Sequence, residues 1–317
     1  MKSVFITGGA GFIGKHICRR LLSSGYGLIV YDNFSNSSEK DFTNEFASFG
    51  QLAVIKGDIT DRDLLTRSLI NSTINSGAIA VVHLAAVVSI QESIRNPELT
   101  SRVNIGGSEN VVAAMKASGI SRAVFASSAA VYGALEPPLY EHLVDSDEIS
   151  AARLLNPYAV SKLEGERIFL NPGLHAAVLR IFNVYGRGQS LAGGYPAVIA
   201  SFLHSSKNNR KISVYGDGLQ SRDFVSAGDV AIAVQLCLEN PAAGGVFNVA
   251  CGRETTLHDI IGIFEDIFSR KIDVEYLPTR PGDIKKSYAD VSRISNVLGF
   301  SPSDNLYDGL RRLAFED

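Results

Sequence analysis

Tyr158 and Lys162 lie four positions apart in a segment with the pattern of a helix. At that spacing two side chains share one face of a helix, so the lysine ammonium can lie beside the tyrosine phenol. A free phenol has a pKa of about 10, and for it to act as a base near neutrality this value must fall by roughly 3 units, or about 4 kcal/mol. A neighbouring cation is one of the few groups that lower it. The pair predicts a tyrosine base, although the spacing alone is also common on exposed helix surfaces.

A glycine-rich turn near the start of the chain has the composition of a phosphate-binding loop. Gly8, Gly11 and Gly14 follow a short apolar run and lead directly into a helical pattern over residues 15–22. Glycine permits a positive φ in the turn, and without a Cβ it lets a pyrophosphate approach the N-terminus of the helix. Strand, turn and helix occur in the order that dinucleotide binding requires, so we expect a dinucleotide cofactor here.

Acidic residues after the second and third expected strands indicate which dinucleotide is bound. Asp32 ends the second strand, where a carboxylate accepts hydrogen bonds from the adenosine ribose hydroxyls and repels a 2′-phosphate. No Arg or Lys follows it among residues 33–35, so the sequence favours NAD over NADP. Asp58, with Ile59, follows the third strand and is expected to flank adenine. A simple turn aspartate is the other interpretation of Asp32.

The fourth expected strand ends in a histidine that is followed by small or apolar residues. Leu84, Ala85 and Ala86 leave room for the nicotinamide ribose. Ligands of open parallel sheets bind beyond the carboxyl ends of the strands, which is where these residues fall. For His83 itself, a buried histidine with satisfied hydrogen bonds is favoured over a chemical role.

Short apolar runs alternate with helical patterns through the first half of the chain. Runs without polar alternation are typical of strands covered on both faces, which predicts an α/β fold with a doubly wound parallel Rossmann sheet. We predict a NAD-binding domain over 1–180, rejoined by 227–250, and a smaller, interleaved C-terminal α/β substrate lobe over 181–317. The expected strands are 4–6, 27–30, 53–55, 79–82, 123–125, 176–181, 212–214 and 246–249, with a helix at 229–238.

Composition narrows the partners and the compartment. The 317-residue chain is 45% hydrophobic and has a net charge of −3, which gives no reason to expect nucleic acid or an anionic membrane as a partner. Cys18, Cys237 and Cys251 are widely spaced and lack the spacing of metal ligands, so we expect free thiols, no metal site and a cytoplasmic location. No run reaches the roughly 18 apolar residues of a membrane span.

Further motifs extend over nearly the whole chain. They are Val-Asn-Ile-Gly-Gly-Ser at 103–108, Ser-Ser-Ala-Ala-Val-Tyr-Gly at 127–133, Arg-Ile-Phe-Asn-Val-Tyr-Gly at 180–186, Gly-Asp-Gly-Leu-Gln-Ser-Arg-Asp-Phe at 216–224 and Arg-Pro-Gly-Asp at 280–283. Together with the glycine turn, His-Leu-Ala-Ala at 83–86 and the Tyr158 and Lys162 pair, they resemble the extended short-chain dehydrogenase/reductase family, in its nucleotide-sugar branch. Within that branch the chain is most similar to the UDP-hexose 4-epimerases.

The resemblance implies an enzyme that inverts C4 of a UDP-sugar through a transient 4-keto sugar, with NAD held throughout. It implies that Lys162 holds the nicotinamide ribose and, with the positive charge of the cofactor, keeps the pKa of Tyr158 low. The catalytic residues would be Ser128, Tyr158 and Lys162. The cofactor residues would be Gly8, Gly11, Phe12, Ile13, Gly14, Asp32, Asn33, Asp58, Ile59, Leu84, Ala85, Ala86, Asn104, Tyr158 and Lys162. The substrate residues would be Ser128, Tyr158, Asn183, Val198, Tyr215, Arg222, Arg280, Asp283 and Ser287, at the sugar site and in the UDP-sugar-binding lobe. Both arginines would bind the pyrophosphate, and Asp283 would bind the uridine ribose.

Ala129 and Ala130 depart from the patterns of that family. The related sugar dehydratases carry Asp-Glu directly after the catalytic hydroxyl residue, and because alanine cannot transfer a proton, the resemblance disfavours dehydration. Ala130 also replaces a threonine of the epimerases, which removes one expected hydrogen bond to substrate. Ser287 stands where a tyrosine accompanies plain glucose and galactose and a small residue admits an N-acetyl group. Tyr288 follows directly, and a shift of one position would reverse that conclusion.

Other functions on the same scaffold stay open at this point. A UDP-glucuronate 4-epimerase would need a further cation for the sugar carboxylate, and a nucleotide-sugar reductase would consume stoichiometric nicotinamide. An NAD-sensing regulatory protein is disfavoured because the residues Ser128, Tyr158 and Lys162 are all present. Helical patterns at 97–118 and 156–169 have apolar faces that pack on the sheet, and the resemblance implies that they also join two copies in a homodimer.

Overall fold

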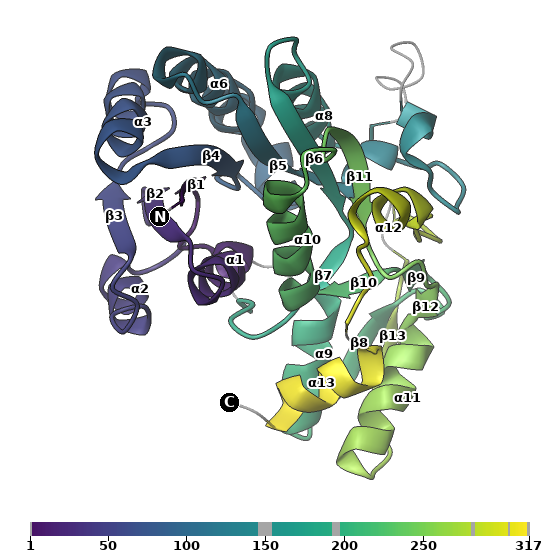
Figure 1. The fold of residues 1–317 in the computed structure, drawn as a ribbon. Helices are drawn as coiled ribbons and strands as arrows, with labels where there is room; N and C mark the ends of the chain where they lie inside the picture. Colours follow the sequence, from purple (N-terminus) through teal and green to yellow (C-terminus); the bar gives the residue numbers. More distant parts are fainter. Residues whose placement is uncertain (1, 145–153, 192–196, 280–282, 304, 316–317) are drawn as a thin grey trace.

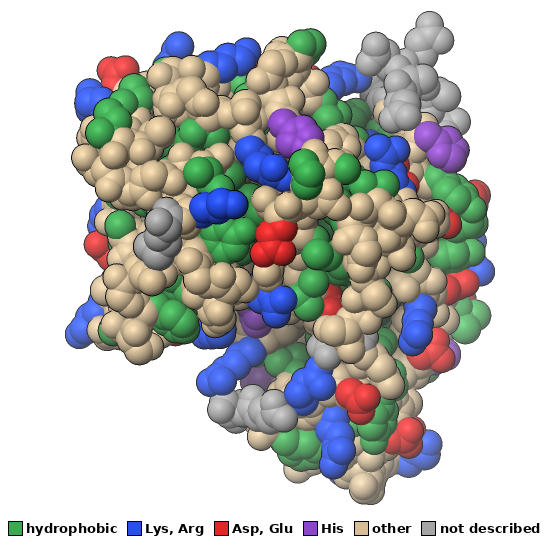
Figure 2. All heavy atoms as spheres, in the orientation of Figure 1, with side chains coloured by type: hydrophobic (Ala, Val, Ile, Leu, Met, Phe, Trp, Pro, Cys, Tyr) green, Lys and Arg blue, Asp and Glu red, His purple; other side chains and the backbone are tan. Residues whose placement is uncertain are grey.

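A computed structural model of the chain describes residues 2–144, 154–191, 197–279, 283–303 and 305–315 (Figure 1). These residues form a large lobe around one parallel sheet and a smaller lobe below it in the view. Lys and Arg side chains are spread over both lobes on the face that Figure 2 shows. Within the described residues, no helix is both long enough and apolar enough to cross a membrane.

A seven-stranded sheet organises the large lobe. Its strands are β1 (Ser3–Thr7), β2 (Gly27–Asp32), β3 (Leu52–Lys56), β4 (Ala78–His83), β5 (Arg122–Ser128), β6 (His175–Ile181) and β11 (Gly245–Val249). The strand order is β3-β2-β1-β4-β5-β6-β11, and every neighbouring pair is parallel. The order reverses between β1 and β4, because the chain first builds outward to β3 and then returns to the other side of β1. The predicted doubly wound parallel sheet is confirmed.

Successive residues of each strand face opposite sides of the sheet, and both sides are apolar. In β1, Val4 and Ile6 belong to the core on one side, whereas Phe5 belongs to the core on the other. In β6, Leu179 and Val178 divide in the same way, and all five side chains are buried. Because helices cover both faces, the strands carry continuous apolar runs, which is the pattern that identified them.

Helices cover the two faces of the sheet. The first face carries α1 (Phe12–Ser23), α2 (Glu39–Glu45), α10 (Ala227–Glu239) and α12 (Ser292–Leu298), and the second carries α3 (Arg62–Ser76), α6 (Gly107–Ser118) and α8 (Pro157–Phe169). Figure 1 shows α1 beside α10 on one face and α3 beside α6 on the other, and both pairs are in contact. The helix predicted at 229–238 therefore lies in the large lobe, inside α10.

The helix predicted over 97–118 is interrupted. After α4 (Ile90–Arg95), the chain forms α5 (Pro97–Thr100), then a π-helical turn (Ser101–Gly106), and then α6. A π-helical turn changes the direction of the side chains that follow it, and such turns are frequent at functional sites. Here the turn contains Asn104, whose side chain is buried.

The smaller lobe consists of short strand pairs and helices around its own core. Its elements are β7 (Asn183–Tyr185), α9 (Val198–Lys207), β8 (Ile212–Tyr215), β9 (Ser221–Arg222), β10 (Phe224–Ser226), β12 (Thr255–Thr256), α11 (Leu257–Phe268), β13 (Val274–Leu277) and α13 (Leu306–Phe315). β8 pairs with β13 and β7 with β10 in parallel, while β9 pairs with β12 in antiparallel. Phe202, Val214, Phe264 and Leu310 are buried in this core.

The two lobes are interleaved in the sequence. The chain enters the smaller lobe after β6, yet β11 follows five of that lobe's elements and pairs with β6 at the edge of the main sheet. After β11 the chain forms α11 and β13 of the smaller lobe, and α12 then packs on β11. The strand predicted at 246–249 therefore lies in the large lobe.

Candidate active site

The segments whose residues could bind a ligand or react lie together at the carboxyl ends of β1, β4 and β5. In open parallel sheets, ligands bind at this edge where the strand order reverses, which here is between β1 and β4. Gly8 follows β1, Leu84 and Ala85 follow β4, and Ser128 ends β5. The N–H groups of Leu84 and Ala85 donate to the Thr7 carbonyl at 3.0 and 3.1 Å. The glycine turn and the end of β4 are therefore directly joined.

The glycine turn leaves no room for side chains. Gly8 has a φ of +72°, and a Cβ there would lie 2.5 Å from the backbone nitrogen of Ala85. A Cβ on Gly14 would lie 2.6 Å from the carbonyl oxygens of both Gly8 and Gly9. Gly11 precedes α1, and no side chain caps this helix. Because its first N–H groups point out of the helix without a side-chain acceptor, the turn fits the pyrophosphate of a dinucleotide.

Asp32 is fixed in place beside the glycine turn. Its Oδ2 accepts a hydrogen bond from the Ala10 N–H at 2.9 Å, and its Oδ1 accepts one from the Phe34 N–H at 2.8 Å. A carboxylate has about four lone-pair sites, so both oxygens keep acceptor capacity for ribose hydroxyls. Phe12 and Ile13 open α1 on the other side of the turn.

Asp58 and Asn33 are bonded to each other. The Asn33 Nδ2 donates to the Asp58 Oδ2 at 2.8 Å, and the N–H and hydroxyl of Thr60 donate to the Asp58 Oδ1 at 2.9 and 2.7 Å. Burial opposes ionisation, but these hydrogen bonds lower the pKa of Asp58 below its ordinary value. Ile59 is buried against Gly107 of α6, so its side chain serves the core.

Asn104 ties the loop after β4 to α8. Its Oδ1 accepts from the Val87 N–H at 2.7 Å, and its Nδ2 donates to the Val87 carbonyl at 3.0 Å and to the Ser161 hydroxyl at 2.9 Å. A side-chain amide has two N–H donors, and both are used inside the protein. Asn104 therefore positions the segment 84–86, and a direct bond to the cofactor would have to use the remaining lone pair of Oδ1.

His83 is a core residue, which confirms the favoured interpretation. Its ring makes hydrogen bonds with the Thr7 hydroxyl at 2.6 Å and the Ser108 hydroxyl at 3.2 Å, and it stacks on Phe125. Burial, and to a smaller extent the charge of Lys162, lowers the pKa of His83 to about 3. The ring is neutral near pH 7 and adds no charge to the site.

Ser128, Tyr158 and Lys162 meet where the end of β5 lies against α8. The Asn156 side chain caps α8, and Pro157 opens its first turn, which places Tyr158 in that turn. The Tyr158 phenol makes a hydrogen bond with the Ser128 side chain. Lys162 lies one turn later, with its Nζ 5.9 Å from the centre of the Tyr158 ring. The structure thus brings the three residues predicted to be catalytic into one cluster.

The ammonium of Lys162 is not bonded to the phenol. Its Nζ donates to the Ala126 carbonyl at 2.8 Å. Burial lowers the pKa of Lys162 to about 8, while the negative charge of Glu166 acts in the opposite direction. Burial also raises the pKa of Tyr158 above its ordinary value, against the hydrogen bond to Ser128.

In the protein alone, burial outweighs the hydrogen bond to Ser128 and raises the pKa of Tyr158, so the lowering by Lys162 together with the charge of the cofactor stays a prediction. Burial dominates because both side chains are enclosed, and desolvation disfavours the charged form of each. The lysine ammonium also points to a backbone carbonyl, not to the phenol oxygen.

Arg222 and Asp283, predicted to bind different parts of a nucleotide, are paired with each other. The Arg222 Nη2 donates to the Asp283 Oδ1 at 2.8 Å, and its Nη1 donates to the carbonyl oxygens of Ser221 and Ile284 at 2.8 and 2.7 Å. A guanidinium has five N–H donors, so these three bonds leave donors for a phosphate. The sequence did not indicate this pairing, since the two residues are far apart along the chain.

Ser287 lies beside this pair. It is 8% exposed, and its N–H donates to the Ser221 carbonyl at 3.2 Å, next to Arg222. Tyr288 is half-buried, and its carbonyl accepts from the Leu139 N–H at 3.0 Å. Ser287 is thus the more enclosed of the two side chains that were weighed for the size of the sugar pocket.

The other residues predicted to bind substrate lie in or at the smaller lobe. Asn183 begins β7 and donates its N–H to the Asp223 carbonyl at 3.0 Å. Val198 begins α9 and packs against the core of the lobe, and Tyr215 ends β8. Arg280 lies outside the described residues.

Asp223 is a buried residue that the sequence did not single out. Its Oδ1 accepts from the Cys251 N–H at 2.8 Å, and its Oδ2 accepts from the N–H groups of Arg253 and Ala289 at 3.1 and 3.2 Å. Burial raises the pKa of Asp223 to about 6, although these backbone hydrogen bonds oppose the shift. The carboxylate joins the end of β11 to the segment that carries Ser287.

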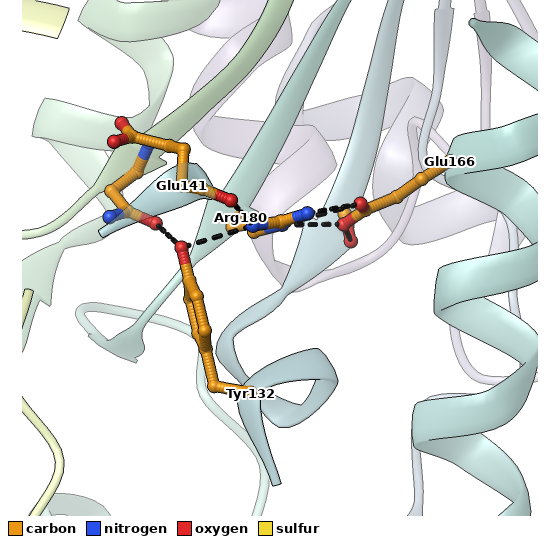
Figure 3. Close-up of polar contacts among 6 residues, drawn as sticks. Tyr132, Glu141, Glu166 and Arg180 are labelled. Carbon is orange, nitrogen blue, oxygen red and sulfur yellow. Dashed lines mark hydrogen bonds and ion pairs between the residues drawn. The ribbon is translucent and has the colours of Figure 1, made fainter. Parts of the chain in front are cut away.

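A buried ion pair behind the catalytic cluster was also missed (Figure 3). The Arg180 Nη2 lies 2.8 Å from the Glu166 Oε2, and the two side chains are only 2% and 3% exposed. Arg180 also donates to the Tyr132 hydroxyl at 3.2 Å and to the Glu141 carbonyl at 2.7 Å. Glu166 follows Lys162 by four residues, so the same helical spacing that joined Tyr158 to Lys162 could have identified it.

Comparisons with known proteins identify the family of the chain. Residues 4–250 match the NAD dependent epimerase/dehydratase family. A UDP-glucose 4-epimerase of Mycolicibacterium smegmatis is 30% identical over 97% of this chain and 96% of its own length, and a UDP-glucuronate 4-epimerase of Thermodesulfobacterium geofontis is 30% identical over 97% and 93%. A solved UDP-N-acetylglucosamine 4-epimerase from Methanobrevibacter ruminantium, in complex with UDP-N-acetylmuramic acid, is 35% identical over 99% and 98%, with a TM-score of 0.88.

These matches cover both lobes, so they include the glycine turn, the cluster around Tyr158 and the strands that carry Arg222. They confirm the resemblance to the nucleotide-sugar branch that the motifs indicated. The chain belongs to the NAD dependent epimerase/dehydratase family.

Proposed function

We propose that this protein is an NAD-dependent 4-epimerase of UDP-hexoses. The observation that carries the proposal is the cluster of Ser128, Tyr158 and Lys162 at the carboxyl edge of the sheet, beside a turn shaped for a dinucleotide. A buried phenol next to a hydroxyl suits proton transfer to and from a secondary alcohol. The epimerase names of the relatives support this reaction over the reductase and sensor alternatives.

The large lobe would hold NAD across the point where the strand order reverses. When bound, NAD supplies a hydride acceptor that is also a hydride donor, the chemistry that interconverts an alcohol and a ketone. The glycine turn and the N-terminus of α1 would hold the pyrophosphate, and Asp32 the adenosine ribose. Asp58 would lie at the adenine, and Ala85 and Lys162 at the nicotinamide ribose.

Tyr158 would move the proton of the sugar 4-hydroxyl. As a phenolate it removes that proton while the hydrogen on C4 leaves as hydride, so that the alcohol becomes a 4-keto sugar. The hydride then returns to the opposite face of C4, and Tyr158 gives the proton back to the oxygen. The product is an isomer of the substrate, and no oxidant or reductant is consumed. Ser128 would share the proton through its hydrogen bond to the phenol.

The smaller lobe would hold the UDP group while the sugar rotates. Arg222 and Arg280 would bind the pyrophosphate, and Asp283 the uridine ribose. The Arg222 and Asp283 side chains are 19% and 29% exposed. Arg222 keeps N–H donors beyond its bond to Asp283, and these would bind the phosphates. Anchoring the UDP end leaves the sugar free to rotate and present either face of C4.

Ser287→Tyr is expected to lower kcat/KM for UDP-N-acetylglucosamine by about tenfold more than for UDP-glucose, because the added ring would fill space that an N-acetyl group needs. The position is enclosed, which favours a steric effect. Initial rates on both sugars measure the ratio, and Ser287→Ala serves as the small-residue control. An equal loss on both sugars would remove Ser287 as a size gate.

A panel of sugars tests the proposed function as a whole. Purified protein, with no NAD added, is incubated separately with UDP-N-acetylglucosamine, UDP-glucose and UDP-glucuronate, and products are resolved by anion-exchange chromatography and proton NMR. The 4-epimers of the first two sugars are expected. Turnover of UDP-glucuronate alone would favour the uronate epimerase, and products that need stoichiometric NADH would favour a reductase. No conversion even with NAD supplied would contradict the proposal.

We also propose that two copies associate through α8 and the helical segment predicted at 97–118, and that α4, which directly precedes that segment, takes part as well. Helices α4 and α8 are in contact, and they expose apolar side chains that a monomer leaves in water: Ile94 is 55% and Val160 41% exposed. Val160→Glu is expected to give a monomer in sedimentation analysis, because it would bury a charge in the interface. Ile74→Glu, at an exposed apolar position on α3, is the matched control. A wild-type monomer would contradict the dimer.

We propose a cytoplasmic location for this protein, and the cysteines support it. Cys18 and Cys237 are buried, Cys251 is half-buried, and none of the three forms a disulfide with another described residue. Burial raises the pKa of the Cys18 thiol above its ordinary value and that of Cys237 to about 12, so neither is a reactive thiolate. Cysteines that form no disulfide are typical of reducing compartments.

A further inference from the structure

Glu166 lies on the same face of α8 as the catalytic cluster. Tyr158, Lys162 and Glu166 follow one another at intervals of four residues, the spacing that aligns side chains along a helix. The Glu166 carboxylate accepts from Arg180 through Nη2 at 2.8 Å and through Nε at 3.0 and 3.2 Å. It also accepts a hydrogen bond from the Ser127 hydroxyl. Four contacts therefore fix a carboxylate that is almost fully buried.

The ion pair is anchored from the side opposite to α8 (Figure 3). The Arg180 guanidinium lies 5.0 Å from the centre of the Tyr132 ring and donates to the Tyr132 hydroxyl. That hydroxyl in turn donates to the Asn248 Oδ1 at 2.6 Å, in β11. The same guanidinium nitrogen, Nη1, also donates to the Glu141 carbonyl. Tyr132 and Glu141, both in the segment after β5, hold Arg180, and Arg180 holds Glu166.

The groups that face Lys162 come from three elements. On α8 these are Tyr158 and Glu166, and on β5 they are a backbone carbonyl and an aromatic ring. On β4 it is His83, which is neutral near pH 7. Arg180 on β6 is bonded to Glu166. Among the described residues, Glu166 is the carboxylate whose charge acts on the ammonium.

We propose that Glu166 is a positioning residue of the reaction, held by Arg180 and Ser127 so that its negative charge keeps Lys162 protonated beside Tyr158. This proposal rests on the proposed function. Burial alone disfavours the ammonium, and a neutral lysine would no longer offset the cost of burying a phenolate. The hydrogen bond between Ser127 and Glu166 also holds the end of β5 in place. The next residue of that strand, Ser128, contacts the Tyr158 phenol.

The first test is the pH dependence of kcat in Glu166→Gln. In the wild type the ammonium is lost as pH rises through the pKa of Lys162, about 8, so activity falls on the alkaline side. Removing the carboxylate charge lowers that pKa further, and we expect the alkaline limb to move lower by about one pH unit. Glu164→Gln removes an exposed carboxylate on the same helix, paired with Arg167, and should leave the limb in place. An unchanged limb in folded Glu166→Gln would overturn the proposal.

A second variant separates the effect of the charge from a folding defect. Glu166→Gln leaves the Arg180 guanidinium buried without its counter-ion, which is strongly destabilising. Glu166→Gln combined with Arg180→Gln removes both charges at once and leaves the net charge unchanged. The double variant should fold and show a limb displaced in the same direction, by less than in Glu166→Gln, because the positive charge of Arg180 is removed as well. A folded double variant with the wild-type limb would overturn the proposal.

A third measurement needs no catalysis. The pKa of Lys162 is about 8 in the folded protein and 10.5 for a free lysine, so the unfolded state binds more protons between these values. The free energy of unfolding must therefore rise with pH through that window. In the double variant the rise should begin below pH 8, and it should disappear when Lys162→Met is added. If the wild type converts no sugar, the proposed function fails, but the pH dependence of unfolding still tests the charge interaction. Equal curves of unfolding free energy against pH, with and without Glu166, would refute an interaction between Glu166 and Lys162.

Discussion

Tyr158→Phe is expected to lower kcat by about 10²–10⁴-fold, the usual contribution of a positioned proton-transfer group. Phenylalanine keeps the ring that lies near Lys162 and loses only the hydroxyl that Ser128 contacts. The nucleotide end of the substrate binds elsewhere in this account, so the affinity for UDP should stay close to that of the wild type. Initial rates by proton NMR and calorimetric titration with UDP measure the two quantities.

Two further variants serve as comparisons for Tyr158→Phe. Ser128→Ala should cost less than Tyr158→Phe, because the phenol can act on the sugar hydroxyl directly. Tyr307→Phe changes a tyrosine that is 37% exposed on α13 and should leave kcat unaltered. Turnover of Tyr158→Phe near the wild-type rate would show that this hydroxyl carries no proton in the reaction.

Gly14→Ala is expected to abolish the retention of NAD through purification and to lower its affinity by at least about tenfold, or about 1.4 kcal/mol. The new Cβ would lie 2.6 Å from two backbone carbonyl oxygens of the turn, so the turn has to move away from α1. Overpacking of this kind also costs about 1–3 kcal/mol of stability. The absorbance spectrum of the purified protein and a titration with NAD measure the loss.

Gly262→Ala is the matched control for this substitution. Gly262 is also a helical glycine, in α11, but a Cβ there meets nothing within 4 Å. Alanine has the higher helix propensity, so this variant should retain NAD and gain about 0.5–1 kcal/mol in stability. If Gly14→Ala binds NAD as well as Gly262→Ala does, the turn is not the pyrophosphate site.

The sequence was most informative where the chemistry is local. The apolar runs of β1 and β6 identified a sheet covered on both faces, because each strand contributes side chains to two cores. Gly8, Gly11 and Gly14 could be interpreted because backbone conformation and missing Cβ atoms act within one turn. The position of Lys162 one turn after Tyr158 follows from helical spacing, and Ser128 joined them through the resemblance of its motif.

The features that were missed depend on contacts between distant segments. Arg222 meets Asp283 only after the smaller lobe has folded, so neither residue revealed that it is the partner of the other. Burial decides the charge state of Tyr158, and the depth of burial is not visible in the spacing of two residues. Glu166 likewise became significant only through Arg180, which arrives from the neighbouring strand β6.

The fate of the hydrogen on C4 tests the central claim most directly. UDP-N-acetylglucosamine with deuterium at C4 is incubated with the purified protein in ordinary water, and the product is analysed by proton NMR and mass spectrometry. If the hydride leaves and returns within one site, UDP-N-acetylgalactosamine should carry the deuterium at C4 in full. Exchange of the deuterium for solvent hydrogen would mean that C4 is inverted by removal and return of a proton, and would contradict the account.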